Sequence, residues 1–295
     1  MIRSWTRWAS YAATAVVLCF VLSLVSSLVV ESLPVLRQEG LSYLSGKTWH
    51  SRAGIFGALP MIYGSIVVSV IALALAAPLG VGAALFSAEY LSGRRRWIVK
   101  APIELLAGIP SVVYGLLGVL LLRNWIYELL EPFDPLSGDT LLTAGVLLAV
   151  MVLPTVMTLS DDALRGVPAS QRRAARGLGL TRAEGILRVS LPQAAPGLAA
   201  ALLLGFGRAL GETIAVFLVV GRQDNQWPET LLSPRAWFEA GQTLTSKLGG
   251  SETFVAYGDP LHWGAIVGLG LILLTLVAGL TLLAGRWLPD GRRHA

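Results

Sequence analysis

Residues 53–88 read AGIFGALPMIYGSIVVSVIALALAAPLGVGAALFSA and contain no charged side chain. A helix needs about 20 consecutive apolar residues to cross the hydrocarbon core of a bilayer. The stretch is longer than that, and Pro60 favours a helix that begins near Met61, because proline is tolerated in the first turn of a helix. This stretch therefore predicts one transmembrane helix over residues 61–87 and an integral membrane protein.

Five further apolar runs have the same character. The chain is 54% hydrophobic and only 14% charged, whereas soluble domains carry about 25% charged residues. The first run exceeds the apolar core of about 7–15 residues that a secretory signal has, so we expect an uncleaved span. The fold class expected is all-α: a single transmembrane domain over residues 1–295, with no soluble domain between the spans. The six predicted spans cover about residues 10–31, 61–87, 102–122, 140–159, 196–220 and 262–285.

The distribution of basic residues predicts the orientation. Of the 23 Lys and Arg residues, fifteen lie on the side of the termini, seven lie on the other side and Arg208 lies within a span. Loops rich in Lys and Arg stay in the cytoplasm, so both termini are expected there, in an inner membrane. Arg94, Arg95 and Arg96 are expected to anchor the chain at lipid headgroups. Membrane lipid, and not nucleic acid, is the partner that this charge pattern favours.

Neither a cofactor nor an enzymatic activity is expected. The single cysteine, Cys19, and three scattered histidines offer no disulfide and no metal cluster. Residues Gly40–Thr48 look like a phosphate-binding P-loop, but five residues separate the glycines and the motif needs four. The segment also lies on the outer side, away from cytoplasmic ATP. Any ATP hydrolysis is therefore expected on separate subunits.

Two predicted spans contain an internal proline. Pro110 in the third span and Pro154 in the fourth each remove a helical hydrogen bond and can kink the helix. Such kinks serve as gating hinges or only shape the packing, and both interpretations stay open. Gly108, Gly115 and Gly118 are expected to allow close approach of a neighbouring helix.

The inner loop, residues 160–195, has a pattern of its own. Small residues at Ala174 and Ala175 are followed by Gly179, and eleven residues separate Gly179 from Leu191-Pro192. The spacing predicts a short helix, a glycine turn, a second helix and a proline that opens the next span. The small residues leave room for a cytosolic partner, although an ordinary amphipathic loop has the same features.

The same pattern resembles the EAA loop of ABC-importer permeases, the element that docks into the ATPase subunit. This chain has Arg173 where that family has its leading Glu. The difference removes one polar docking contact but leaves the helix-turn-helix shape. The resemblance assigns ATPase coupling to Ala174, Ala175, Gly179, Leu191 and Pro192.

Three further stretches resemble phosphate-specific (Pst-type) permeases. Residues 103–115 resemble the third-span signature, residues 205–216 resemble the fifth-span signature of the PstC-like subunit more than the PstA-like one, and residues 56–65 fit the entry to span two. The resemblance implies a channel half with type I, MetI-like architecture that does no chemistry itself. It also implies a second, PstA-like permease, a cytosolic PstB-like ATPase dimer, a periplasmic phosphate-binding protein and inorganic phosphate as the cargo.

Arg208 and Glu212 are the charged residues inside the fifth predicted span. Positions i and i+4 share a helix face, so the two side chains are expected to meet. A mid-membrane arginine costs about 2.5–3.5 kcal/mol on insertion scales and usually faces a bundle interior or water. Its planar fork of donors suits phosphate, and Glu212 would neutralise it in an empty pathway. The alternative is a purely structural ion pair that locks helices together.

Three other functions stay open. Sulfate or molybdate is the second choice of cargo within the same transporter class. An ion-coupled secondary anion transporter is the alternative without an ATPase, and uptake that persists without one would favour it. A membrane scaffold or signalling subunit is the third, which normal phosphate uptake after deletion of the subunit would favour.

Overall fold

The computed structural model describes residues 2–133, 135–228 and 234–287. Within them, six helical segments are long and apolar enough to cross a membrane, the number that the sequence predicts. They are Thr6–Glu39, Leu59–Tyr90, Ser111–Phe133, Leu141–Arg165, Arg182–Gly211 and Pro260–Arg286. Arg292 and Arg293, which contribute to the predicted charge bias, lie outside the described residues.

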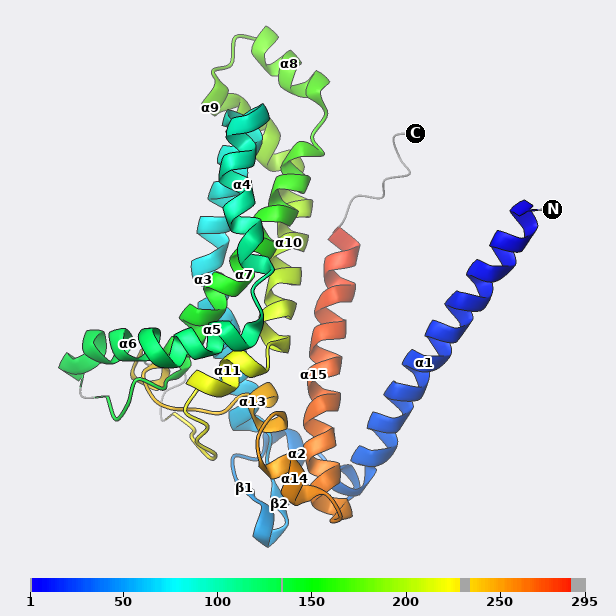
Figure 1. The fold of residues 1–295 in the computed structure, drawn as a ribbon, viewed down its shortest axis with the longest axis vertical. Coiled ribbons are helices and arrows are strands. Elements are labelled where there is room, and N and C mark those ends of the chain that lie inside the picture. Colours follow the sequence, from blue (N-terminus) through cyan, green and yellow to red (C-terminus); the bar gives the residue numbers. More distant parts are fainter. Residues whose placement is uncertain (1, 134, 229–233, 288–295) are drawn as a thin grey trace.

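The long helices form an upright bundle (Figure 1). They are α1 (Ile2–Glu39), α3 (Leu59–Tyr90), α4 (Gly93–Ala107), α7 (Leu141–Arg165), α10 (Leu191–Gly211) and α15 (Pro260–Trp287). Helices α3, α4, α7 and α10 run side by side, whereas α1 meets α15 only near its C-terminal end and then leans away from it.

Shorter elements gather at the two ends of the bundle and across its middle. One end, called the inner end after the predicted orientation, has α8 (Ala169–Gly177), α9 (Arg182–Gly185) and a π-helical turn (Ile186–Ser190) that leads into α10. The opposite, outer end has α2 (Ser42–Ser45), β1 (Trp49–His50), a 3-10 turn (Ser51–Ala53), β2 (Ile55–Phe56), α13 (Leu244–Leu248) and α14 (Glu252–Ala256). Strands β1 and β2 pair antiparallel. The crosswise elements are α5 (Ser111–Leu117), a π-helical turn (Gly118–Leu122), α6 (Arg123–Leu130) and α11 (Ile214–Val219). A 3-10 turn (Glu131–Phe133) follows α6. Helix α12 (Pro234–Trp237) lies in the outer loop.

Helix α7 is the centre of the core. Its buried side chains, among them Leu148, Val152 and Val156, pack against Val68 and Ala72 of α3 and against α10. Pro154 lies within α7, yet the helix is continuous around it. The fourth predicted span is therefore an unbroken helix, and it packs against α3, α10 and α4.

The third predicted span, 102–122, is wrong as a continuous helix. Helix α4 ends at Ala107, Pro110 is extended and α5 begins at Ser111 in a crosswise direction (Figure 1). In a continuous helix the N–H of residue 110 would bond to the carbonyl of Leu106, and proline has no N–H. The Tyr114 hydroxyl donates to that carbonyl instead, at 2.9 Å. The helix thus breaks where its hydrogen-bond ladder is interrupted.

Candidate functional site

Arg208 lies in the last turn of α10, deep in the membrane-spanning layer. A Cβ atom added to the preceding Gly207 would lie 3.9 Å from Val277 of α15. Val277 is about 15 Å from the inner end of α15 and about 25 Å from its outer end, at a rise of 1.5 Å per residue. Arg208 therefore lies level with the middle part of α15.

The Arg208 side chain points away from the core. Its neighbours Gly207, Ala209 and Leu210 are buried, whereas Arg208 is exposed. It forms no ion pair or hydrogen bond with any residue that the structure describes. Intramembrane arginines face a protein interior or water in preference to lipid. The exposed face of α10 at Arg208 therefore belongs to a protein interface or an aqueous pathway.

The predicted pairing of Arg208 with Glu212 on one helix face is wrong. Helix α10 ends at Gly211, and Glu212 has extended backbone angles, φ −74° and ψ 125°. Both residues are described, and no ion pair joins them. Glycine lowers helix propensity at this point, and a cation in the last turn offsets the negative end of the helix dipole. The fifth predicted span, 196–220, therefore consists of α10, a break at Glu212 and Thr213, and the crosswise α11.

The two broken spans pack against each other. A Cβ atom added to Gly115 of α5 would lie 3.2 Å from the Cα of Ala215 in α11, and one added to Gly118 would lie 2.7 Å from a methyl of Val219. The predicted role of these two glycines in close helix approach is thus confirmed, whereas Gly108 meets only a carbonyl of its own helix. Irregular backbone at membrane depth is tolerated where it is buried in protein or lines water, and the break at Glu212 is half-buried.

The inner loop has the predicted shape. Gly179 has φ +79°, a left-handed conformation that favours glycine, and it separates α8 from α9. Ala174 and Gly179 are exposed, Ala175 is buried and Leu191 is half-buried at the start of α10. Pro192 is the second residue of α10. The exposed small residues leave an open surface at the inner end.

Salt bridges that the sequence analysis missed fasten this loop to α3. Arg172 of α8 contacts the buried Glu89 carboxylate at 3.1 Å. Arg182 of α9 donates to the Glu89 carbonyl and lies over the Tyr90 ring at 4.7 Å. Both short helices of the loop therefore hold the C-terminal end of α3, so that a displacement of the loop would be transmitted to that span.

A second buried carboxylate, Asp161 of α7, binds α4. It forms ion pairs with Arg96 and with Lys100, the latter at 3.4 Å. Arg94 and Arg95 are exposed, in agreement with the predicted contact with lipid headgroups. The same prediction is wrong for Arg96, because its guanidinium pairs with the Asp161 carboxylate.

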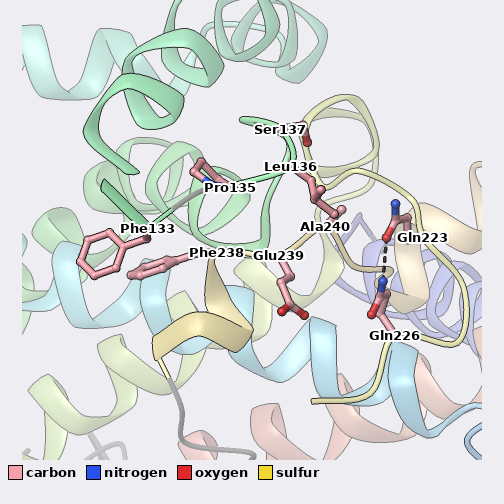
Figure 2. A pocket seen from close by; sticks show the side chains of 9 residues that line it. All are labelled: Phe133, Pro135, Leu136, Ser137, Gln223, Gln226, Phe238, Glu239 and Ala240. Atoms are coloured by element: carbon pink, nitrogen blue, oxygen red, sulfur yellow. Dashed lines mark hydrogen bonds between the residues drawn. The ribbon is translucent and has the colours of Figure 1, made fainter. Parts of the chain in front are cut away.

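The outer end contains two hollows on either side of residues 222–224. The larger has a volume of about 410 Å3. Its lining residues are Phe133, Pro135, Leu136, Ser137, Gln223, Gln226, Phe238, Glu239 and Ala240, and Figure 2 shows Gln223 and Gln226 joined by a hydrogen bond, which is 2.8 Å long. The smaller, about 290 Å3, contains Arg222 and Lys247. Lys247 lies in a loop on the outer side, where a charged side chain is expected in solvent, but the side chain is buried.

Comparison with known proteins defines the class. Residues 76–288 match the family model of the binding-protein-dependent transport system inner membrane component. The match covers more than half of the chain, which therefore belongs to this family of multi-pass inner-membrane permease subunits. The structure resembles that of an inward-facing MetNI methionine ABC transporter, with TM-score 0.54 and 15% identity over 77% of this chain and 94% of that one. It also resembles a bacterial alginate ABC importer, with TM-score 0.54 and 17% identity over 95% and 96% of the two chains. The predicted all-α permease architecture is confirmed.

Sequence relatives are more specific. The chain is 33% identical over 281 residues to the phosphate transport system permease protein PstC of Mesorhizobium japonicum, covering 90% of this chain and 83% of the relative. It is 33% identical over 307 residues to PstC 1 of Mycobacterium tuberculosis, covering 92% and 89%. It is 35% identical over 238 residues to the probable ABC transporter permease protein YqgH of Bacillus subtilis, covering 81% and 73%. The predicted similarity to PstC-like permeases is confirmed.

Proposed function

We propose that this chain is the PstC-like channel-forming subunit of an ATP-driven importer of inorganic phosphate. The observation that carries the proposal is Arg208, a mid-membrane guanidinium on an exposed helix face, in a chain similar to PstC permeases. The donors of Arg208 are not used by any described residue, and a planar fork of donors matches the geometry of a phosphate. A single exposed arginine gives a weak, transient site, which suits an ion that must also leave.

Glu212 has a different role in this proposal from the one that the sequence suggested. It lies at the break that follows α10 and is half-buried. Without a direct ion pair it does not block Arg208, and its negative charge near the pathway weakens the hold on the anion. Both residues are thus proposed to contact the transported phosphate.

The inner loop is proposed to dock on a PstB-like ATPase dimer through Ala174, Ala175, Gly179, Leu191 and Pro192. Arg172 and Arg182 hold the loop to α3, so movement of the ATPases would rock the spans between outward- and inward-facing states. The other partners proposed are a PstA-like permease, facing the exposed side of Arg208, and a periplasmic phosphate-binding protein at the outer end. Both termini are proposed to lie in the cytoplasm.

The test is uptake of labelled phosphate by the complete complex in proteoliposomes, with ATP inside or outside. We expect uptake only where ATP reaches the ATPases, and little competition from sulfate or molybdate. Uptake that continues without the ATPase subunits would favour an ion-coupled secondary transporter. Strong competition by sulfate or molybdate would assign a different oxyanion to the same permease.

A further inference from the structure

The smaller outer hollow brings cationic and anionic side chains together. It lies between α11, the segment that follows α11, and helices α13 and α14, and its volume is about 290 Å3. Because a water molecule takes about 30 Å3 of liquid volume, the hollow has room for a small solvated ion. Arg222, Asp224, Lys247 and Glu252 line it.

Arg222 is the unpaired cation of this hollow. Its guanidinium lies 4.6 Å from the centre of the Phe217 ring, and it forms no ion pair with any residue in the described part of the chain. Its φ of +53° is in the left-handed region, which is uncommon for a residue with a side chain. Such conformations concentrate at functional sites. No described residue accepts a hydrogen bond from the Arg222 guanidinium, so its N–H donors are available to a ligand.

Lys247 is fixed by acidic partners. It is 2% exposed, its Nζ lies 2.6 Å from Asp224 Oδ2, and it forms a second ion pair with Glu252. The Trp49 ring is 5.0 Å away. Lys247 therefore offsets much of the charge of the two carboxylates and holds both at the wall of the hollow that Arg222 also lines.

This mixture of charges selects for one kind of anion. Arg222 donates hydrogen bonds, whereas ionised carboxylates only accept them. An anion that fits must therefore accept a hydrogen bond from the guanidinium and donate a hydrogen bond to a carboxylate. Hydrogen phosphate does both, because it retains a hydroxyl at neutral pH. Sulfate has no proton to donate and would be repelled by Asp224 and Glu252.

The hollow lies directly beyond the break in the fifth span. Its wall includes Phe217 of α11, and a Cβ atom added to Gly249 would lie 3.1 Å from the methyl of Thr213. Helix α11 is about 9 Å long at 1.5 Å per residue. We propose that the hollow is an outer waiting site, in which Arg222 and its neighbouring carboxylates bind hydrogen phosphate on its way to Arg208. This inference rests on the proposed phosphate transport.

The experiment compares Arg222→Asn with a matched control, Arg52→Gln, in the complete complex. Asparagine tolerates the left-handed conformation, and Arg52 is an exposed outer arginine that does not line the hollow. Hydrogen exchange is followed over residues 221–224 and 244–252 with inorganic phosphate, with sulfate and without anion. ATP-driven phosphate uptake is measured in the same preparations.

We expect phosphate, but not sulfate, to slow exchange in both segments of the unmodified complex and of Arg52→Gln. In Arg222→Asn we expect phosphate to give no such protection. We also expect its uptake rate to be at least tenfold lower at low concentrations of the phosphate-loaded binding protein. Equal protection and equal uptake in the two variants would overturn the waiting site while phosphate transport itself stands. Absence of uptake in the unmodified complex would instead refute the proposed function.

Discussion

Replacing Glu89 by alanine is expected to loosen the hold of α3 on α8 in the inner loop, while the contacts of Arg182 with the Glu89 carbonyl and the Tyr90 ring remain. The Glu89 side chain is 6% exposed and that of Arg172 is 20% exposed, so the change removes one partner of a largely buried pair. Such losses cost about 3–5 kcal/mol. The lower end applies because Arg172 is partly exposed and keeps its hydrogen bond to the Leu164 carbonyl. At about 1.4 kcal/mol per tenfold, a cost of about 3 kcal/mol is a ~150-fold change in the opening equilibrium.

Hydrogen exchange of the α8 amides in the purified complex measures this opening. We expect these amides to exchange up to ~150-fold faster in Glu89→Ala. The matched control is Glu104→Ala, because the Glu104 side chain is 51% exposed and pairs with Lys100 at 3.3 Å on the same side of the protein. Exposed pairs contribute only about 0.2–1 kcal/mol, so the α8 amides should keep their protection in the control.

A double variant separates the salt bridge from other effects. Glu89→Ala combined with Arg172→Ala should destabilise the loop by less than the sum of the two single changes, because both remove the same contact. The reasoning is refuted if Glu89→Ala exchanges no faster than the Glu104→Ala control, or if the two single effects are simply additive.

Three further outcomes are expected. Gly179→Trp should leave the chain inserted but reduce co-purification of the ATPase, because the ring fills the open surface at the turn; unchanged co-purification with full transport would remove the docking role. Reporter fusions near Gly179 should indicate cytoplasm and fusions near Lys47 and Gly241 periplasm, and a cytoplasmic signal at Gly241 would contradict the six-span topology. Burial raises the pKa of Glu252, but hydrogen bonds from Lys247 and Trp49 outweigh it and hold the pKa below its ordinary value. The stabilisation from this ionised carboxylate is therefore present above the ordinary pKa of about 4.3 and lost as the pH falls through the lowered one. Proteolysis of the outer end should accelerate in acid, and Glu252→Gln should make it less dependent on pH; the same acid dependence in that variant would exclude Glu252 as the cause.

The sequence predicts the spans well because length and apolarity alone decide whether a helix can cross a bilayer. It does not predict where a helix breaks, because that depends on neighbours. The sequence predicts that Pro110 and Pro154 can each kink a helix, but only Pro110 lies at a helix break. The helix that follows it, α5, packs closely against α11. The shared face of Arg208 and Glu212 fails for the same reason, since i and i+4 meet only if the helix continues.

Patterns along the sequence do not predict the buried ion pairs. Glu89 meets Arg172, and Asp161 meets Arg96, across large separations in sequence. Lys247 likewise meets Asp224 and Glu252 only through the folding of the outer loop. The inner loop was predictable in shape because Gly179 and Pro192 mark its turn and its end locally.

The central claim is that Arg208 handles the transported anion, and the most direct measurement is phosphate uptake by Arg208→Leu in reconstituted vesicles. Since an arginine at this depth costs about 2.5–3.5 kcal/mol on insertion, the leucine variant should insert and assemble at least as well as the original chain. No ion pair with Glu212 is present to be broken, so a single change suffices. At matched levels of complex we expect ATP hydrolysis to continue and phosphate uptake to be lost, with Arg208→Lys also impaired because a point charge does not replace the planar fork. Near-normal uptake by Arg208→Leu would contradict the account and leave Arg208 as a contact between permease subunits.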